Sequence, residues 1–275
     1  VRAQSTTTLV VDIAPPTVGI VRDGLVGGDE VQYSASNETY AGTWRWFDDT
    51  GTGIAFYEAA LGTSPFATDA VDWQDVGLTT RVFFSMFDSQ QLQQGQTYYL
   101  SVRATDLAGH TAEQSSNGFT VDITPPPPGI VEHGLAATAT RRYTNRMDLI
   151  LLQWPTIDDA ESGVVSYEYG ISSTPAVSVD GQPDMTPYVF VGLSQQAVAV
   201  ELELEHAHVY YGAVRTLNGV GLKGTSFSGG VMVDVTPPVC SALDGVAGGA
   251  DLDFSTSGVP RVSVACEDLE SGAES

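Results

Sequence analysis

The chain has 275 residues, of which 42% are apolar, and this is enough for two or three domains that each bury their own core. It carries 34 acidic residues against 11 basic ones, a formal net charge of −23, which argues against partners with phosphate backbones or anionic membrane surfaces. No apolar run reaches the length of about 20 residues needed to span a bilayer, so no direct membrane insertion is expected in this segment. The acidity is typical of a secreted protein kept soluble by charge, or of one that binds divalent cations.

One motif occurs three times and divides the chain. Val-Asp-Ile-Ala-Pro-Pro begins at position 11, Val-Asp-Ile-Thr-Pro-Pro at 121 and Val-Asp-Val-Thr-Pro-Pro at 233, so the copies are 110 and 112 residues apart. Such spacing is that of whole domains rather than of short solenoid repeats. The Val-Asp-Val/Ile part favours a strand, and Pro-Pro ends it because proline cannot donate to a β-ladder.

These junctions predict the domain organisation. Residues 1–13 are expected to form the closing strand of an upstream β-sandwich, 14–124 and 125–236 two complete domains, and 237–275 the start of a third, truncated repeat. We therefore expect the chain to be a part of a longer repetitive protein, with any signal or anchor outside it.

The predicted strands follow one order in both complete domains. In the first they cover residues 18–21, 43–47, 54–58, 81–87, 98–104 and 119–121. In the second they cover 129–131, 149–154, 164–168, 197–204, 210–216 and 231–233, and a more variable middle segment holds Trp73 and Val76 in the first domain and residues 188–191 in the second. In 197–204 the alternation places Val198, Val200, Leu202 and Leu204 on one face. No helical periodicity is present. About seven short strands in about 110 residues predict all-β, antiparallel seven-strand sandwiches joined head to tail.

Two stretches carry a resemblance to a known family. The run 149–154 ends in Trp154, followed by Pro155, and Trp44 stands at the matching place of the first domain. The alternating series are Tyr98, Leu100, Val102, Ala104 and Tyr210, Gly212, Val214, Thr216. The pattern resembles the fibronectin type III family, within the wider immunoglobulin-like group, and its junctions are similar to those of tandem repeats in large extracellular surface proteins. The resemblance implies the sandwich fold and an extracellular or cell-surface location.

The chain departs from that pattern at two places. Ser263 stands where the tryptophan of the third repeat is expected, and Gly212 replaces a larger core residue, so we expect a larger neighbour to fill the space at Gly212. Both cysteines, Cys240 and Cys266, lie in the third repeat on neighbouring predicted strands. They predict a disulfide in an oxidising compartment, and the alternative is a pair of buried free thiols.

Acidic side chains recur at the junctions and in the turns after the tryptophan position. The junction residues are Asp12, Asp122 and Asp234, and the turn residues are Asp48, Asp49, Asp158, Asp159, Glu161, Glu267, Asp268 and Glu270. Shared between repeats, they could hold Ca²⁺, which takes 6–8 oxygen ligands. The alternative is that they cap turns by local hydrogen bonds. No cofactor is required by either interpretation.

Other polar motifs are weaker. His206 and His208 would place two imidazoles on one face of a strand, half of a zinc site, but no third ligand lies near in sequence and a solvent-facing pair is the simpler interpretation. Asn37-Glu38-Thr39 is an acceptor sequence for N-glycosylation. The known nucleophile, phosphate-binding and metalloprotease motifs are absent, so the chain is not expected to be an enzyme.

We therefore expect a non-enzymatic structural or adhesive segment of a long extracellular repeat protein, such as a surface coat, an appendage filament or an adhesin stalk. Its partners would be other copies, or neighbouring surface or filament proteins. One alternative is a module that recognises a glycan or protein through loops at the end of a sandwich, with Trp73 and Tyr188 available for stacking on a sugar. Another is a spacer in a secreted multidomain enzyme.

Overall fold

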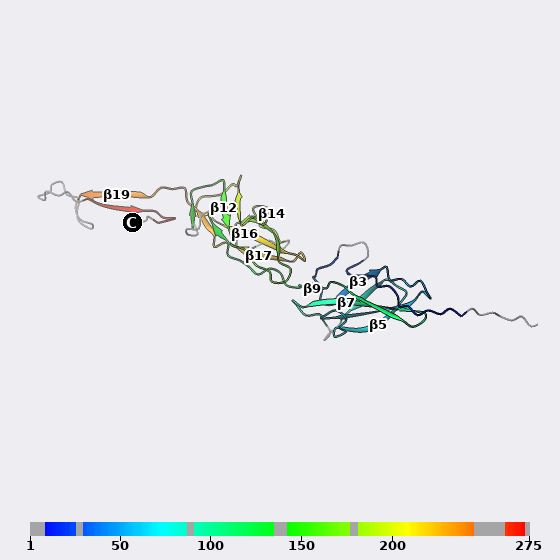
Figure 1. Cartoon of the computed structure of the whole chain (residues 1–275). Coiled ribbons are helices and arrows are strands. Elements are labelled where there is room, and N and C mark those ends of the chain that lie inside the picture. The colour runs from blue at the N-terminus through cyan, green and yellow to red at the C-terminus, as the bar shows by residue number, and fades with distance from the viewer. Residues whose placement is uncertain are drawn as a thin grey trace, which may run out of the picture. The chain divides into compact units, whose positions relative to one another are not determined.

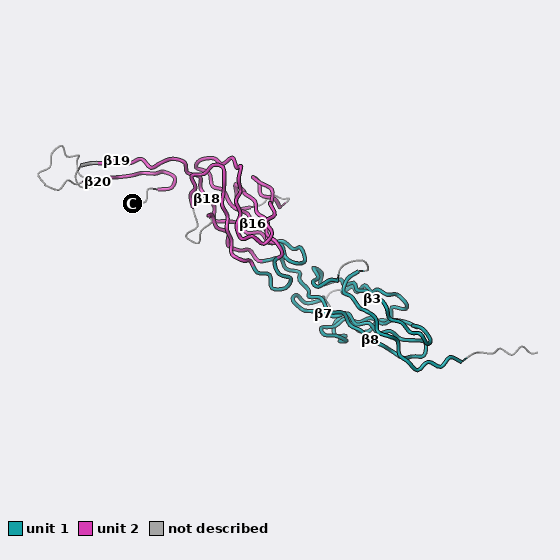
Figure 2. The backbone as a smooth tube through the Cα atoms, turned by 45° about the horizontal axis from the view of Figure 1, so that its top comes forward, with its two compact units in different colours: residues 1–126, 158–164, 217–223 teal, residues 127–157, 165–216, 224–275 magenta. Residues whose placement is uncertain are grey.

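The computed structural model describes residues 9–25, 30–86, 91–134, 142–176, 181–244 and 262–272, and every regular element in them is a β-strand (Figure 1). The described residues include no helix long and apolar enough to cross a membrane. The chain divides into two compact units (Figure 2). Unit 1 holds residues 1–126, 158–164 and 217–223, and unit 2 holds 127–157, 165–216 and 224–275. The domain boundaries expected from the junction motifs stay a prediction.

The first sandwich consists of two sheets. The smaller sheet has the order β1 (Ile20–Asp23), β3 (Thr39–Arg45), β6 (Arg81–Ser85). The larger has the order β2 (Tyr33–Ser34), β9 (Phe119–Val121), β7 (Thr97–Asp106), β4 (Ile54–Gly62), β5 (Val71–Gly77), and β8 (Thr111–Ser115) also pairs with β7. The pairings are antiparallel except for β2 with β9, which run parallel.

The second sandwich repeats this plan. Its smaller sheet has the order β10 (Glu132–His133), β12 (Ile150–Gln153), β15 (Gln196–Ala199). Its larger sheet has the order β11 (Tyr143–Thr144), β18 (Val231–Val233), β16 (Val209–Asn218), β13 (Val164–Ser172), β14 (Val189–Gly192), and β17 (Lys223–Phe227) pairs with β16. A further antiparallel pair is formed by β19 (Val239–Asp244) and β20 (Val262–Glu267). The predicted all-β class and the sandwich architecture are confirmed.

The core of the first sandwich lies between its two sheets. Trp44 on β3 is 3% exposed and meets Tyr57 on β4 edge to face, with ring centroids 5.7 Å apart. Leu100 and Val102 on β7 are fully buried against them. Trp154 and Tyr167 make the same contact in the second sandwich, at 5.8 Å. The two predicted tryptophan positions therefore occupy equivalent places in the two cores.

A glycine and a leucine exchange places between the two cores. In the first sandwich Gly42 on β3 faces Leu100 on β7, and a Cβ atom on the glycine would overlap the leucine side chain. In the second, Leu152 on β12 faces Gly212 on β16, and a Cβ atom there would overlap Leu152 in the same way. The expectation that a larger neighbour fills the space at Gly212 is confirmed, because close packing requires one large and one small residue at each such contact.

The predicted strand 197–204 is shorter in the structure, and its alternating residues do not all lie on one face. β15 ends at Ala199 rather than continuing to Leu204, and Ala197 and Ala199 point into the core at 6% and 5% exposure. Val198 and Val200 are 41% and 59% exposed. These residues were expected on one face with Leu204, but Leu204 is 2% exposed, so they do not share one environment. Ala197 and Ala199 are the cross-strand neighbours of Leu152 and Ile150 on β12. Position 87 of the predicted strand 81–87 lies outside the described residues.

Candidate functional site at the repeat junctions

The residue after β9 is the centre of a hydrogen-bond network in unit 1. Asp122 has no exposed surface, and its Oδ2 accepts from the Ser162 hydroxyl at 2.5 Å and from Asn218 Nδ2 at 2.9 Å. Its Oδ1 accepts from the Thr124 amide at 3.2 Å and from Gln94 Nε2 at 3.3 Å. Four neutral donors thus replace the water that a buried carboxylate loses, and they offset the cost of its burial.

The Ser162 hydroxyl is placed by a turn of the form Asp-x-x-Ser-Gly. Asp159 begins the turn, and its Oδ1 accepts from the amides of Ser162 and Gly163, both at 3.1 Å. Gly163 has a φ of +70°, a backbone conformation that residues with a Cβ atom rarely adopt. The turn aspartate therefore fixes the loop, and the loop directs its hydroxyl at Asp122. We name the junction aspartate, the turn aspartate and the turn hydroxyl residue together the junction latch.

The first junction has the same latch. Asp12 Oδ2 accepts from the hydroxyl of Thr52 at 2.7 Å and from its amide at 2.9 Å. Asp49 Oδ2 accepts from the amides of Thr52 and Gly53 at 2.8 and 2.6 Å, and Gly53 has a φ of +84°. The hydroxyl of Thr52 is the main cause that lowers the pKa of Asp12 below its usual value. Gly51 is also required here, because a Cβ atom at this position would overlap the Asp12 carboxylate.

The third junction, in unit 2, completes the series. Asp234 accepts from the amide and hydroxyl of Thr236 at 3.0 and 2.9 Å, and a hydrogen bond from the Ser271 hydroxyl is the main cause that lowers its pKa. Asp268 accepts from the amides of Glu270 and Ser271 at 3.1 and 2.9 Å. Gly272 has a φ of +76°. The latch residues are Asp12, Asp49, Thr52; Asp122, Asp159, Ser162; and Asp234, Asp268, Ser271.

The structure gathers some of the predicted acidic residues and leaves others apart. Three groups have possible ligand atoms within 4.8 Å of one another: Asp12, Asp106, His110; Asp122, Asp159, Glu161; and His206, Asp234, Glu270. Asp48, Asp158 and Glu267 are exposed and belong to none of these groups.

The donor set at the second junction does not fit a calcium ion in the described arrangement. The hydrogens of Ser162 and Asn218 point at the Asp122 oxygen that a cation would share, and calcium needs 6–8 oxygens with free lone pairs. The other two groups include an imidazole, a ligand for zinc or copper rather than for calcium. The turn-capping interpretation of these residues accounts for their described contacts, and calcium binding stays a prediction.

The histidine pair does not lie on a strand. Residues 206–207 form a turn before β16, with Ala207 at a φ of +61°, so the expectation of two imidazoles on one strand face is wrong. His206 lies 4.0 Å from Asp234 and 3.8 Å from Glu270, residues too far away in sequence to be found by local spacing. His208 has a 62% exposed side chain and lies 3.6 Å from Glu205.

The two cysteines form the predicted disulfide. Cys240 on β19 and Cys266 on β20 are directly opposite in the antiparallel register and are covalently joined. The alternative of free thiols is therefore wrong, and both residues are exposed rather than buried. Asn37 is half-buried just before β3, and its glycosylation stays a prediction.

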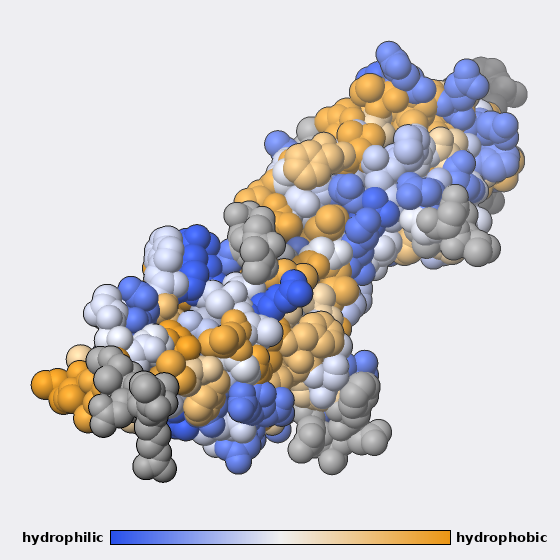
Figure 3. All heavy atoms as spheres, turned by 90° about the vertical axis from the view of Figure 1, so that its right-hand side faces the viewer, coloured by the Kyte–Doolittle hydropathy of each residue, from blue (hydrophilic) through white to orange (hydrophobic). Residues whose placement is uncertain are grey.

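The two aromatic residues proposed for sugar stacking already stack on arginines. The guanidinium carbon of Arg103 lies 4.2 Å from the centre of the Trp73 ring, and that of Arg215 lies 3.9 Å from the centre of the Tyr188 ring. Cation–π contacts of this kind occupy one face of each ring. Elsewhere the surface mixes apolar and polar residues, as the face displayed in Figure 3 shows. A sugar could therefore stack only on the second face of either ring.

Known proteins resemble the chain only distantly. No model of a known protein family matches it, and no curated protein does. Among solved structures, titin domains A168–A170 are 16% identical with a TM-score of 0.45, over 78% of this chain and 66% of that one. A 1.5-MDa bacterial ice-binding adhesin is 10% identical with a TM-score of 0.45, over 85% and 70%. The fibronectin(III)-like modules of Clostridium thermocellum CbhA are 9% identical with a TM-score of 0.35, over 78% and 95%.

Proposed function

We propose that the chain is a non-enzymatic structural or adhesive segment of a long extracellular repeat protein, in which the junction latches restrict movement between successive repeats. The observation that carries this proposal is the recurrence of one hydrogen-bond arrangement at all three junctions. Each time, an aspartate that ends one repeat accepts from the hydroxyl of a turn that belongs, in sequence, to the next repeat. A contact repeated with the domain period is expected for a spacing or load-bearing element.

Two further observations support this role. The Cys240–Cys266 disulfide suits an oxidising compartment, which supports an extracellular location. The formal net charge of −23 suits a protein that stays soluble without a bound partner and that repels copies of itself except at specific contacts. Partners on this proposal are further copies or neighbouring surface or filament proteins.

The test compares three forms of the whole chain. Ser162→Ala removes the hydroxyl of the second latch, whereas Ser162→Thr keeps a hydroxyl and makes the second latch resemble the first, which has Thr52. Residual dipolar couplings, measured separately for the two sandwiches, report whether they tumble as one body. We expect coupled alignment in the wild type and in Ser162→Thr, and independent alignment in Ser162→Ala. Identical alignment of all three forms would refute a role of the latch in joining repeats.

A further inference from the structure

The longest strand ends in a different residue in each complete sandwich: β7 of the first ends in an aspartate, and β16 of the second ends in an asparagine. Asp106 and Asn218 occupy equivalent places, each eight residues after a buried tyrosine, Tyr98 or Tyr210. Both are almost fully buried, at 2% and 1% exposure. Oδ1 has the same task in both, because it accepts from the amide four residues later at 2.8 Å. The two side chains therefore hold their loops in the same way.

The second terminal atom has a different task in each sandwich. In Asn218 it is an amide nitrogen, which donates to Asp122 Oδ2 at 2.9 Å, to the Thr124 carbonyl at 3.1 Å and to Asp159 Oδ2 at 3.3 Å. One amide thus bridges the junction aspartate and the turn aspartate of the second latch. Glu161 lies beside these two carboxylates as a third acidic group. The donor that joins the two carboxylates therefore belongs to the last residue of β16, Asn218.

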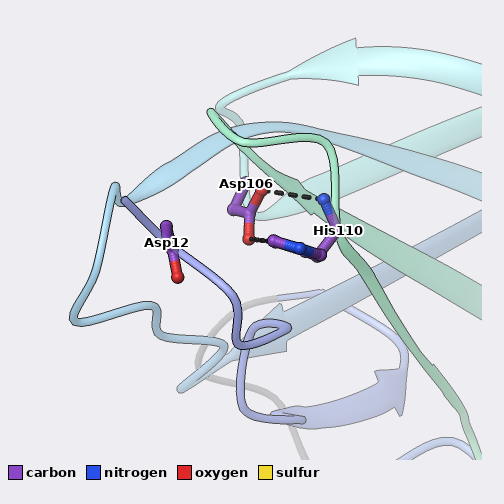
Figure 4. A group of neighbouring side chains, drawn as sticks. All are labelled: Asp12, Asp106 and His110. Atoms are coloured by element: carbon purple, nitrogen blue, oxygen red, sulfur yellow. Dashed lines mark hydrogen bonds and ion pairs between the residues drawn. The ribbon is translucent and has the colours of Figure 1, made fainter. Parts of the chain in front are cut away.

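In Asp106 the second terminal atom is a carboxylate oxygen, which has no hydrogen to donate. Asp106 lies in one cluster with Asp12, so two carboxylates are neighbours at the first latch (Figure 4). Its described partner is the His110 ring, with Nδ1 at 3.0 Å from Asp106 Oδ2. Leu222 occupies the place of His110 in the second sandwich and offers no side-chain donor. The histidine is therefore present where the amide is absent.

We propose that the residue at the end of this strand determines how a junction latch is closed. Asn218 closes the second latch with its own amide. At the first latch Asp106 sets a second carboxylate beside Asp12, and the latch depends on the His110 ring, which contacts Asp106 and lies in the same cluster, to hold the two acids together. This inference rests on the proposed function, since it concerns the same latches. It implies that residues 106 and 110 act as a pair, as do residues 218 and 222, and that exchanging one member alone opens the latch.

Amide hydrogen exchange on the whole chain tests this pairing, read at Thr52 for the first latch and at Ser162 for the second. Asn218→Asp is expected to raise exchange at Ser162 about tenfold, the effect of one lost hydrogen bond with about 1.4 kcal/mol. Adding Leu222→His should restore it. In the first sandwich, His110→Leu should raise exchange at Thr52, and adding Asp106→Asn should restore it. Each single variant has the other latch of the same molecule as its control.

Unchanged exchange at Ser162 in Asn218→Asp, or at Thr52 in His110→Leu, would overturn the proposal. So would repair of Asn218→Asp by added Ca²⁺ but not by Leu222→His, because the missing partner would then be a cation. Protection of Val214 and Val102, in the centres of β16 and β7, shows that each variant is folded. The exchange assay reports only whether a latch is closed, whereas the dipolar couplings report whether the two sandwiches align together. The inference can therefore fail while the proposed function holds, and the proposed function can fail while the inference holds.

Discussion

A buried histidine makes the second sandwich sensitive to acid. His133 on β10 is 3% exposed, its Nε2 lies 2.7 Å from the Ser228 hydroxyl, and its Nδ1 has no hydrogen-bond partner in the described part of the chain. Burial lowers the pKa of His133 from 6.5 to about 4. The neutral ring is therefore the folded form, and a proton can be added only at a cost in stability.

The sign and size of this effect follow from proton linkage. Between pH 6.5 and about 4 the unfolded chain binds a proton at His133 and the folded chain does not. The contribution to stability is fully present above pH 6.5 and is lost as the pH falls through about 4. The difference between a pKa of 6.5 and one of about 4 corresponds to about 3 kcal/mol of unfolding free energy, and most of this stability should be lost by about pH 4.5.

The assay is hydrogen exchange of core amides in β16, from Val209 to Asn218, compared between neutral and mildly acidic pH after correction for the intrinsic exchange rate. Because many carboxylates also titrate in this range, the comparison is made against His133→Leu, which cannot gain the proton. We expect the wild type to lose about 3 kcal/mol more than His133→Leu on acidification. Equal losses in the two proteins would refute the argument, because the pH dependence would then come from other groups.

Four further predictions concern other side chains that the structure describes. Burial raises the pKa of Asp23, which stands at the place of His133 in the first sandwich, to about 6. The stability that the protonated side chain contributes is therefore fully present below about pH 4 and is lost as the pH rises through 6. Asp23→Asn should remove about 3 kcal/mol of this pH-dependent stability, measured by hydrogen exchange in β7. Gly212→Ala should cost about 1–3 kcal/mol in urea unfolding through overlap with Leu152, and Leu152→Ala in that background should cost less than in the wild type. Reduction of the Cys240–Cys266 disulfide, which joins residues 26 apart, should weaken the β19–β20 pairing by at most about 3.5 kcal/mol, and unchanged protection of β20 would contradict this. Millimolar Ca²⁺ should leave the melting temperature of the second sandwich unchanged, because Ser162 and Asn218 already donate to Asp122; an increase would favour the calcium prediction.

The sequence predicted the parts of the fold that depend on local pattern. Pro-Pro follows the end of β9 and of β18, whereas the described residues 9–13 before Pro15 form no strand, although 1–13 was expected to be one. The alternation from Tyr98 to Ala104 specifies an inward face without knowledge of any partner strand. The two cysteines could be paired because strand positions in the third repeat could be counted from the earlier repeats. The inward face of residues 197–204 could not be predicted in this way, since it depends on how β15 pairs with β12, where Ala197 and Ala199 lie beside Leu152 and Ile150.

The latches could be predicted only in part. The acidic residues were visible in the sequence, but their partners are the hydroxyls of Thr52, Ser162 and Ser271, whose turn pattern Asp-x-x-Ser/Thr-Gly indicates a capped turn and does not identify the distant aspartate that the hydroxyl contacts. The separation does carry one: Asp12 and Thr52 are 40 residues apart, and so are Asp122 and Ser162. A search for polar pairs that recur at the domain period would have found these two, whereas Asp234 and Ser271 are 37 residues apart. Single-site motifs cannot, because a latch is a property of two turns and the distance between them.

The composition explains why these latches use hydroxyls and amides. The chain has 34 acidic and 11 basic residues, so its lysine and arginine side chains are too few to pair with most of its carboxylates. Yet Asp122, Asp159 and Asp234 are 8% exposed or less, and buried carboxylates are costly unless donors surround them. Serine, threonine, asparagine and backbone amides provide these donors without adding charge. The acidic surface and the buried aspartates are therefore compatible only because each junction brings its own neutral donors, and the loss of one donor should have a larger effect here than at an exposed ion pair.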